Sequence, residues 1–496
     1  MAEHGFPSDL IALERGAGTA LHLQLAERLR DLILTGQLPA GQKLPSIRAF
    51  AQTHGISRNT VVSVLDQLSA EGYLESRPGA GIWVGSQVPR ALSETLPRQA
   101  RPAKRLSRRG EIMTNQPRIR SIPGHPTFQP GTPASDSFPF KTWARLLKQN
   151  ASPAGDERLN YHSINGLRAL RENIADYVSA SRGVRASPDR IVVTTGGQAA
   201  LDLVARLLVD PGDTVLVEEP GYQGAQSVFA AAGADLQPLP VSEAGWDLDV
   251  VKERRPRAIY VTPSSQFPLG IAMSLQERLT LIDHARRHGS WILEDDYDSE
   301  YSFHARRIPA LQGLVDDAPV IYFGTFSKLI FPSLRLGYMI LPANLSDRVK
   351  NAISFTGHYA PLFLQAALSD FIAGGHFSRH LSRMRRIYQK RREVFLALCA
   401  DHMETDFRAL DFRSGIQITC MANDHFDDVG FVESLRDRNL NPAPLSSYYC
   451  HTQKRRGLLI GYAAVDEVAM AQGMAEMAEV LKQRAFAGNG LLQVKT

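Results

Sequence analysis

Five short apolar runs between residues 191 and 323 constrain the fold most strongly. They are rich in β-branched and aromatic residues and read Ile191-Val192-Val193, Thr214-Val215-Leu216-Val217, Ala258-Ile259-Tyr260-Val261, Trp291-Ile292-Leu293 and Val320-Ile321-Tyr322-Phe323. Helical stretches such as 198–208, 275–288 and 361–373 lie between or after these runs. Near-continuous apolar runs of this length suit strands that are covered on both faces. The sequence therefore predicts an α/β domain, with a mixed, mostly parallel sheet sandwiched by helices.

Two polar residues follow the fourth and fifth runs, where parallel strands present their ligand-binding loops. Asp295 follows the fourth run, and Lys328 follows the fifth, 33 positions later, in the segment Gly324-Thr325-Phe326-Ser327-Lys328. A lysine amine can form a Schiff base with the aldehyde of pyridoxal phosphate, and a carboxylate keeps the ring nitrogen of this cofactor protonated. A single lysine near serines is usually just solvated, so the prediction of a pyridoxal phosphate site depends on its neighbours.

The other strand ends carry groups that fit the same cofactor. The segment Gly196-Gly197-Gln198 follows the first run and begins a helix, and a helix N-terminus suits a phosphate. Tyr222 follows the second run and could stack on an aromatic ring. Taken alone, the glycines indicate a plain turn and Tyr222 a core tyrosine. Five strand ends with fitting groups in this order are hard to obtain by chance.

Composition limits the remaining possibilities. With 496 residues, 44% hydrophobic and 22% charged, the chain is long enough for two or three globular domains. It has no apolar run of roughly 20 residues and no amino-terminal signal pattern, so we expect a cytoplasmic, nucleoid-associated protein without a membrane partner. The three cysteines, Cys399, Cys420 and Cys450, are too few and too scattered for a disulfide framework or a metal site.

Residues 86–120 differ from the rest of the chain. They contain nine Lys or Arg residues against two acids, together with four prolines and little apolar periodicity. This composition predicts a basic flexible linker over 86–122, either a solvated tether or a segment that also touches DNA phosphate. The predicted domains are therefore 1–85 and 123–485, and the second includes a small carboxy-terminal α+β subdomain from about 376 to 485.

The first 85 residues show the spacing of a helix-turn-helix. Helical periodicity over Leu21–Leu34 is followed by a helix opened by Pro45 and Ser46, a turn at Gly55 and a third helix over 58–71. Ser57 is in position to cap the third helix. Its predicted core residues are Val61, Val62, Val64, Leu65 and Leu68. Residues 72–77 and 81–84 then predict a two-stranded wing.

This amino-terminal region resembles the winged helix of the GntR family of bacterial transcription factors. The resemblance is carried by the blocks Gly36-Gln37-Leu38, Leu44-Pro45-Ser46-Ile47-Arg48, Gly55-Ile56-Ser57-Arg58-Asn59-Thr60-Val61, Gly72-Tyr73-Leu74 and Gly79-Ala80-Gly81. It implies that operator DNA is contacted by Arg48, Ser57, Arg58 and Thr60, with Arg77 and Gly81 of the wing at the minor groove. Surface salt bridges are the alternative for Arg48 and Arg58.

Residues 128–481 resemble the fold type I pyridoxal phosphate enzymes, the class I and II aminotransferases. The resemblance implies that Lys328 holds the cofactor aldehyde, Asp295 the ring nitrogen, Tyr297 the phenolic oxygen and Tyr222 the ring face. It assigns the phosphate to Gly197, Gln198, Thr325, Ser327 and Arg335, and it matches Tyr161 to a tyrosine that crosses a homodimer interface to the neighbouring phosphate.

Two positions depart from the aminotransferase pattern. Phe267 stands before Pro268 where those enzymes usually carry an Asn. Leu459 stands where an arginine normally binds the substrate α-carboxylate, and loss of that charge-assisted contact would weaken amino acid binding. The alternative arginines for this role are Arg413, Arg455 and Arg456.

A winged helix, a basic linker and an aminotransferase-like domain in one chain are similar to the MocR subfamily of GntR regulators. The resemblance implies a homodimeric, DNA-binding regulator of metabolic genes that senses pyridoxal phosphate or an amino compound through Lys328. An active aminotransferase with an accessory DNA-binding domain is the alternative. A regulator that has kept the fold but binds no cofactor is the third hypothesis.

Overall fold

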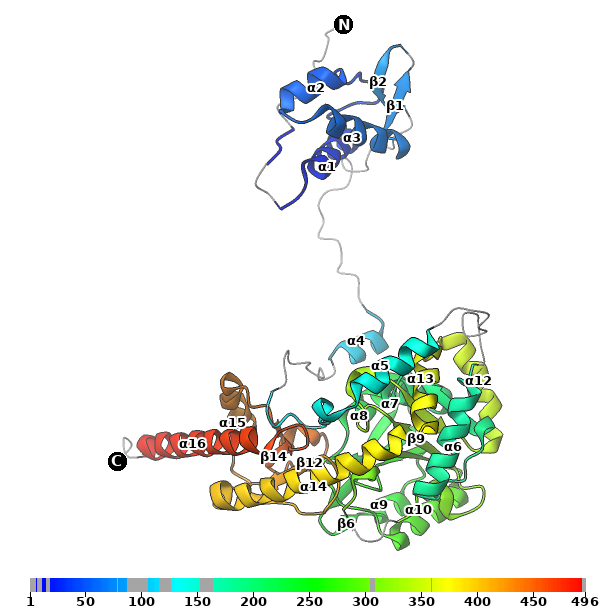
Figure 1. Ribbon diagram of the computed structural model, residues 1–496, viewed down its shortest axis with the longest axis vertical. Coiled ribbons are helices and arrows are strands. Elements are labelled where there is room, and N and C mark those ends of the chain that lie inside the picture. Colours follow the sequence, from blue (N-terminus) through cyan, green and yellow to red (C-terminus); the bar gives the residue numbers. More distant parts are fainter. Residues whose placement is uncertain are drawn as a thin grey trace. The chain divides into compact units, whose positions relative to one another are not determined.

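The computed structural model describes residues 6, 11–14, 18–77, 79–86, 106–115, 126–151, 164–303, 308–357 and 359–492, with side chains to residue 484 (Figure 1). The chain forms two compact units, Met1–Arg105 and Leu106–Thr496. We describe each unit by itself, beginning with the smaller one.

The amino-terminal unit is a winged helix-turn-helix. Its elements are α1 (Leu21–Leu34), α2 (Ile47–His54), α3 (Arg58–Ala70), β1 (Leu74–Arg77) and β2 (Gly81–Val84), and the two strands pair antiparallel. Gly55 takes a left-handed conformation (φ 62°) in the turn between α2 and α3. Ser57 caps α3, because its side chain accepts a hydrogen bond from the Thr60 amide at 3.0 Å.

The core of this unit lies between α1, α2, α3 and the wing. Four of the five residues predicted to face it from α3 are buried: Val61, Val64, Leu65 and Leu68. The prediction for Val62 is wrong, since its exposed fraction is 38%. An α-helix has about 3.6 residues per turn, so the residues that face a core recur every three or four positions. Val62 directly follows the buried Val61 and therefore lies outside the buried face of α3.

The large unit is built on an eight-stranded sheet with the order β3-β10-β9-β8-β7-β4-β5-β6. Strands β4, β5, β7, β8 and β9 run parallel to one another, whereas β10 runs antiparallel between β3 and β9, and β6 pairs antiparallel with β5. The strands are β3 (Ile191–Thr194), β4 (Thr214–Glu219), β5 (Asp235–Ser242), β6 (Gly245–Trp246), β7 (Ala258–Val261), β8 (Trp291–Asp296), β9 (Val320–Thr325) and β10 (Gly337–Ile340).

Both faces of this sheet are covered by helices. The helices are α5 (Phe140–Asn150), α6 (Arg168–Arg182), α7 (Gly197–Leu208), α8 (Gln223–Ala232), α9 (Asp249–Glu253), α10 (Leu275–His288), α11 (Leu311–Leu314), α12 (Ala343–Thr356) and α13 (Leu362–Ala373). Alternate strand residues point to opposite sides: Ile321 and Phe323 pack with α7, α8 and α12, and Val320 and Tyr322 face the opposite cores. The predicted mixed, mostly parallel sheet between helices is confirmed.

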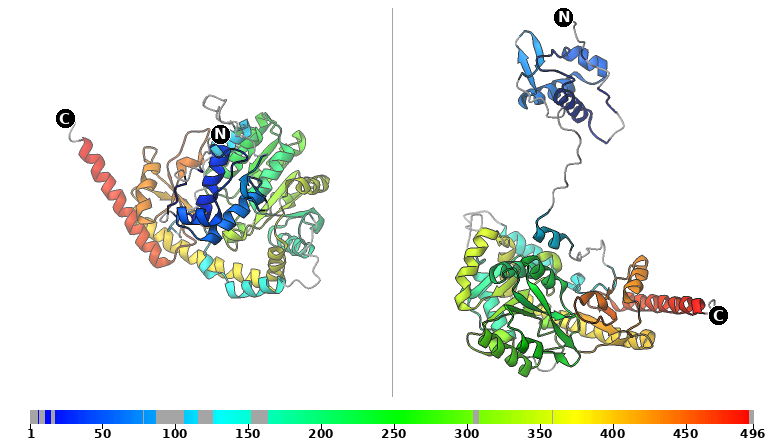
Figure 2. Two further views of the ribbon diagram at one scale, coloured as in Figure 1. Left: turned by 90° about the horizontal axis from the view of Figure 1, so that it is seen from above. Right: turned by 180° about the vertical axis from the view of Figure 1, so that it is seen from behind.

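A small antiparallel subdomain follows at the carboxy-terminal end of the chain. Its sheet has the order β11-β12-β14-β13, and it is joined by α14, α15 and α16, of which α14 and α16 pack against each other (Figures 1 and 2). The elements are α14 (His376–Met403), β11 (Arg408–Ala409), β12 (Gln417–Met421), α15 (Asp428–Leu435), β13 (Ala443–Pro444), β14 (Gly457–Gly461) and α16 (Glu467–Leu492).

One helix lies inside the segment whose composition predicts a linker. Residues Arg108–Asn115 form α4, which packs against α8 in the large unit. Its side chains are mostly exposed, and Ile112 is half-buried. The sequence analysis did not predict α4, because a short charged helix with one covered apolar residue has little periodic signal.

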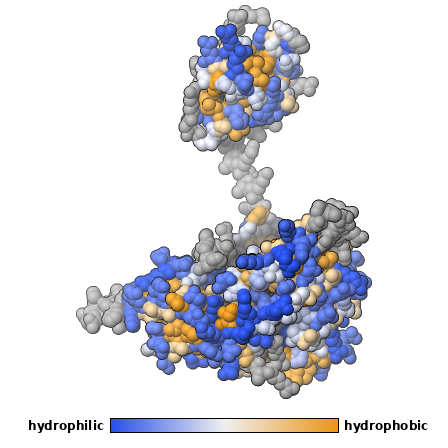
Figure 3. Space-filling model, viewed as in Figure 1, coloured by the Kyte–Doolittle hydropathy of each residue, from blue (hydrophilic) through white to orange (hydrophobic). Residues whose placement is uncertain are grey.

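The visible surface of both units mixes hydrophilic and hydrophobic residues (Figure 3). Among the described residues, every helix is too short or too polar to cross a bilayer.

Candidate functional site

Lys328 and Asp295 lie at the ends of neighbouring parallel strands. Asp295 is in β8 and pairs with Phe323 of β9, and Lys328 follows β9 by three residues. The Lys328 Nζ atom donates a hydrogen bond to the Gly131 carbonyl at 2.6 Å. The Tyr260 hydroxyl donates a hydrogen bond to Asp295 Oδ2 at 2.7 Å, which orients the carboxylate.

Both groups are half-buried and largely removed from water, which makes their charged forms costly. Burial raises the pKa of Asp295 to about 6, although the Tyr260 hydrogen bond and the Lys328 charge oppose this shift. Burial lowers the pKa of Lys328, against the charges of Asp298 and Asp295. A bound group that presents a cation to Asp295 and consumes the Lys328 amine would relieve both effects.

An anion-binding cradle lies beside this pair. Gly196 precedes α7 with φ 102°, and the helix N-terminus has no side-chain cap. A Cβ atom on Gly196 would stand 3.7 Å from Arg335 Cζ, so the guanidinium faces the helix N-terminus. The Ser327 amide donates to Thr325 Oγ1 at 3.1 Å. Free helix amides, a guanidinium and two hydroxyl side chains together suit a phosphate.

Tyr222 is held in place by neighbours from α7 and α8. Its hydroxyl donates to Gln198 Oε1 at 3.0 Å, and Gln198 Nε2 donates to the Gly224 carbonyl at 2.9 Å. A Cβ atom on Gly224 would lie 2.4 Å from the Tyr222 ring, so only glycine allows this approach. The charges of Asp295 and Arg335 both act on the Tyr222 hydroxyl, whose pKa burial raises to about 12. Tyr222 therefore lies within electrostatic reach of both Asp295 and Arg335.

The candidate residues are more exposed to solvent than their neighbours in the sequence. In β8 and the following loop, Asp295 and Tyr297 are half-buried while Glu294, Asp296 and Asp298 are buried. At the end of β9 and directly after it, the half-buried residues Thr325, Ser327 and Lys328 interrupt a buried segment in the same way. The candidate side chains are thus the ones from this region that a ligand can reach.

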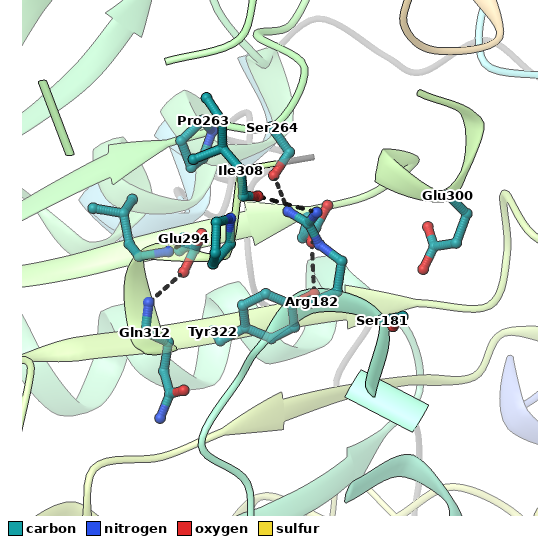
Figure 4. A network of polar contacts seen from close by, with 12 residues as sticks. Ser181, Arg182, Pro263, Ser264, Glu294, Glu300, Ile308, Gln312 and Tyr322 are labelled. Carbon is teal, nitrogen blue, oxygen red and sulfur yellow. Dashed lines mark hydrogen bonds and ion pairs between the residues drawn. The ribbon is translucent and has the colours of Figure 1, made fainter. Parts of the chain in front are cut away.

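Asp296, next to Asp295 in sequence, belongs to a separate buried network (Figure 4). Arg182 Nε donates to Asp296 Oδ2 at 2.7 Å, and the Tyr322 hydroxyl donates to the same oxygen at 2.6 Å. Burial alone would raise the pKa of Asp296, but the Arg182 charge and these hydrogen bonds lower it. Glu294 accepts the Leu311 and Gln312 amides on the same side of the sheet. This network anchors β8 from behind the site.

The segment between β13 and β14 is tied to the end of β4, just before the loop that carries Tyr222. Glu219 Oε1 accepts hydrogen bonds from the amides of Cys450, His451 and Thr452 at 2.7–2.9 Å. Tyr448, also between β13 and β14, packs edge-on against Phe267 with ring centroids 5.2 Å apart. Phe267 also meets Tyr222 and Tyr297 edge-on. Four aromatic rings therefore line one side of the candidate site.

The remaining residues named in the sequence analysis lie in several parts of the large unit. Gly197 begins α7, and Leu459 is fully buried in β14. Arg455 pairs with Asp424 and Arg456 with Asp428 in the small subdomain, and Arg413 is exposed. Tyr161 lies outside the described residues.

Four further residues at the site were not assigned by sequence reasoning: Gly131, Tyr260, Asp298 and Gln417. Tyr260 is the penultimate residue of a predicted strand, and its place near the carboxyl end of that strand was an available signal. Gly131 and Gln417 come from segments far away in sequence, so only the folded chain brings them to Lys328.

In the amino-terminal unit, Arg48 and Arg58 are exposed, and neither has an ion-pair partner in the described part of the chain. Ser57 is exposed and Thr60 half-buried at the start of α3. The Arg77 guanidinium lies 4.8 Å from the Trp83 ring centroid, and Gly81 has φ 104° in the wing.

One basic residue of the wing was missed. Lys43 Nζ lies 5.6 Å from the ring centroid of Trp83, the ring that Arg77 also covers. The available signal for Lys43 in the sequence was its position just before the predicted second helix. Lys43 and Arg77 place positive charge beside the hairpin.

Comparison with known proteins agrees with both units. Residues 21–84 match the family described as bacterial regulatory proteins, gntR family, and residues 130–476 match aminotransferase class I and II. The latter family binds pyridoxal phosphate, and the amine, carboxylate, aromatic ring and anion cradle described above fit that cofactor.

Relatives with the same two-part organisation cover nearly the whole chain. The probable rhizopine catabolism regulatory protein MocR of Rhizobium meliloti is 45% identical over 94% of this chain and 94% of its own length. The pyridoxine biosynthesis transcriptional regulator PdxR of Corynebacterium glutamicum is 28% identical over 95% of this chain and 98% of its own.

The large unit also resembles solved enzymes. The crystal structure of LysN, the α-aminoadipate aminotransferase of Thermus thermophilus, in complex with N-(5'-phosphopyridoxyl)-L-leucine, matches with a TM-score of 0.67 and 27% identity. It covers 72% of this chain and 92% of the enzyme. Together these matches show that the chain belongs to the MocR-type regulators, GntR-family transcriptional regulators that join a winged helix-turn-helix to an aminotransferase-like domain.

Proposed function

We propose that this regulator binds operator DNA through its winged helix and senses pyridoxal phosphate or an amino compound through Lys328. The observation that carries the proposal is the joint presence of an exposed reader and an ordered amine and carboxylate pair. Arg48 and Arg58 are exposed in the reader, and Lys328 and Asp295 lie on adjacent strands. Pyridoxal phosphate, when bound, would supply an aldehyde that the Lys328 amine can attack.

The residues around the site take distinct roles in this proposal. Asp295, oriented by Tyr260, would hold a proton on the ring nitrogen of the cofactor. Tyr222 would cover the ring face, and Tyr297 would meet its phenolic oxygen. The phosphate would lie at the α7 N-terminus, contacted by Gly197, Gln198, Thr325, Ser327 and Arg335.

The proposal extends to DNA and to a second copy of the chain. Arg48, Ser57, Arg58 and Thr60 would contact operator DNA in the major groove, and Arg77 and Gly81 would lie at the minor groove. A homodimer would present two readers to two half-sites, with the segment around 86–122 as the tether. We further propose that the protein acts in the cytoplasm, on the genes of a metabolic pathway.

Effector binding can change operator affinity only if it favours one of two arrangements of the protein. The Lys328→Ala variant should lose the visible absorption of bound pyridoxal phosphate and the effector response of operator binding, while operator binding itself persists. Lys350→Ala, which removes a half-buried lysine of α12 that pairs with Asp347, is the matched control and should change neither. Absorption spectra and fluorescence anisotropy on labelled operator measure both quantities. An effector response that survives in Lys328→Ala contradicts the proposal.

A working aminotransferase is the second candidate. It is favoured by the complete set of cofactor-binding groups and by the TM-score of 0.67 to LysN. Phe267 and Leu459 count against it, because Phe267 replaces a hydrogen-bond donor and Leu459 replaces the arginine that binds a substrate carboxylate. Product formation from a panel of amino acids and 2-oxo acids, followed over many turnovers per protein molecule, distinguishes the two candidates. Product equivalent to a single turnover per protein molecule would not support the aminotransferase candidate.

A further inference from the structure

Two side chains near the start of α3 are presented to solvent without a use inside the protein. Asn59 is exposed, and its amide makes no hydrogen bond in the part of the chain that the structure describes. Val62 has an exposed fraction of 38%, although valine is usually a core residue. The two residues are three positions apart, so they are neighbours on one face of the helix. The buried residues of α3 lie on another face.

The two hydroxyl side chains at this end of α3 are already engaged with each other. Ser57 Oγ accepts the Thr60 amide at 3.0 Å and shares a hydrogen bond with Thr60 Oγ1 at 2.8 Å. Because one of the two hydroxyls donates this bond, a single hydroxyl hydrogen remains for a phosphate oxygen. Ser57 and Thr60 therefore fix the start of the helix and its position on DNA, and sequence readout is left to their neighbours.

Negative charge limits how much of α3 suits a DNA groove. Asp66 is exposed four residues after Val62, and among the described residues it has no ion-pair partner. A carboxylate at this position is repelled by the phosphate backbone. Within residues 57–63 the ionisable side chain is the cationic Arg58. The first two turns of α3, which carry Asn59 and Val62, are therefore the part suited to a groove.

The major groove of B-DNA offers a matching group for each of these two side chains. Adenine presents an N7 acceptor and an N6 donor there, and an asparagine amide can pair with both at once. Thymine presents its C5-methyl group, which is an apolar target in an otherwise polar groove. A helical valine is restricted to one strongly preferred rotamer, so its methyl groups are held in place before DNA binds.

From this arrangement we infer that Asn59 and Val62 determine operator specificity. Asn59 pairs with an adenine, and Val62 packs on the C5-methyl group of a thymine, in each half-site. The inference rests on the proposed function, since it concerns the same DNA-binding surface. It separates the residues that hold the phosphate backbone from the residues that select the sequence. Contact with thymine also removes from water the apolar surface that Val62 exposes in the free protein.

Small chemical changes in the DNA test both contacts with the full-length protein. Repeated selection from a pool of random-sequence duplexes would yield the preferred operator, and fluorescence anisotropy would measure its dissociation constant. Deoxyuridine in place of one thymine removes the C5-methyl group, and 7-deazaadenine in place of one adenine removes the N7 acceptor. In each half-site, at least one replacement of each kind should weaken binding about 3–10-fold. Uniform affinity across all replacements overturns the inference.

Substitutions at Val62 assign the thymine contact. Val62→Ala should weaken binding to the unmodified operator by a similar factor and should not respond to deoxyuridine at the sensitive thymine, since the two changes remove the same contact. Val62→Ile keeps the branched Cβ atom and should retain the response. Leu23→Ala, which truncates an exposed leucine of α1, is the matched control and should behave like the wild type. A response that persists in Val62→Ala contradicts the role of Val62.

A substitution at Asn59 assigns the adenine contact. Asn59→Ala should not respond to 7-deazaadenine at the sensitive adenine, but it should keep the response to deoxyuridine. Because Asn59 and Val62 are exposed, their substitution removes no contact that holds the reader together, and circular dichroism should show unchanged helix content. If a variant does not fold, the replacements in the DNA still decide the question with the wild-type protein. An adenine response that survives in Asn59→Ala contradicts the role of Asn59.

The operator proposal and the specificity inference fail in distinguishable ways. Selection that enriches no sequence would refute operator binding by the reader, and the inference with it. An enriched operator that is bound equally well after every thymine and adenine replacement would refute only the roles of Asn59 and Val62.

Discussion

Two adjacent aspartates illustrate how the surroundings of a residue determine its role. Asp295 and Asp296 are both in β8, but their side chains point to opposite sides of the sheet. Burial raises the pKa of Asp295 to about 6, whereas the Arg182 ion pair and its hydrogen bonds lower that of Asp296. Asp295 is therefore held ready for a cationic partner, and Asp296 already has one.

Asp295→Asn should stabilise the cofactor-free protein at neutral pH and weaken cofactor binding. Because the folded-state pKa of Asp295 lies above its usual value of 3.8, its contribution to stability is fully present below that pH and is lost as pH rises through about 6. A shift of this size corresponds to at most about 3 kcal/mol in the free energy of unfolding at pH 7.5. Denaturant unfolding at pH 5 and 7.5 should show a larger gain at the higher pH.

Asp296→Asn provides the contrasting substitution. The folded-state pKa of Asp296 is lowered, so the contribution of its carboxylate to the free energy of unfolding is present above the usual pKa. This contribution is lost on acidification. Removing the charge leaves Arg182 buried without an ionic partner, and we expect a loss of about 3–5 kcal/mol. Similar effects of the two substitutions on stability would contradict the separate roles assigned here.

At the scale of single elements, α3 depends on the cap at its start. Ser57 accepts the Thr60 amide, so Ser57→Ala should cost about 1 kcal/mol of local stability. Ser57→Asp keeps an acceptor in place and should preserve the helix, but its charge should repel DNA phosphate. Hydrogen exchange of α3 amides and operator affinity, both in the full chain, separate the two effects. Normal operator affinity in a folded Ser57→Asp variant would argue against contact at this position.

At the scale of the whole molecule, α4 connects the amino-terminal segments to the large unit. It packs on α8, which begins directly after Tyr222, the proposed neighbour of the cofactor ring, so a change at Tyr222 would have a short path to α4. Ile112 is its half-buried apolar residue, and Met113 beside it is 54% exposed.

Ile112→Asp should release α4 from α8 and uncouple operator binding from the effector. A coupling of ordinary size changes operator affinity about 5–150-fold, and in this variant the change should fall toward 1. The visible absorption of bound cofactor should be retained. Met113→Asp is the control and should behave like the wild type. Unchanged coupling in Ile112→Asp would exclude α4 as the connection.

The sequence by itself determined the two-part organisation, the parallel strands and the caps of the reader helices. These features depend on local periodicity and on residues such as Ser57 and Gly55, whose preferences act within a few positions. The positions of Lys328 and Asp295 at the ends of neighbouring strands were predictable for the same reason, since each follows an apolar run. Val62 was wrongly assigned to the core, because the sequence alone does not define the edges of the buried face of a helix.

Only the tertiary structure decided which residues surround the amine. Gly131 and Gln417 come from segments far from Lys328 in sequence, and only the folded chain brings them to the neighbourhood of its amine. The opposite environments of Asp295 and Asp296 likewise arise from partners on α6 and β7 that no local pattern specifies. Charge and hydrogen bonding act through space, so the balance of acceptors and cations at this site emerges only when the chain is folded.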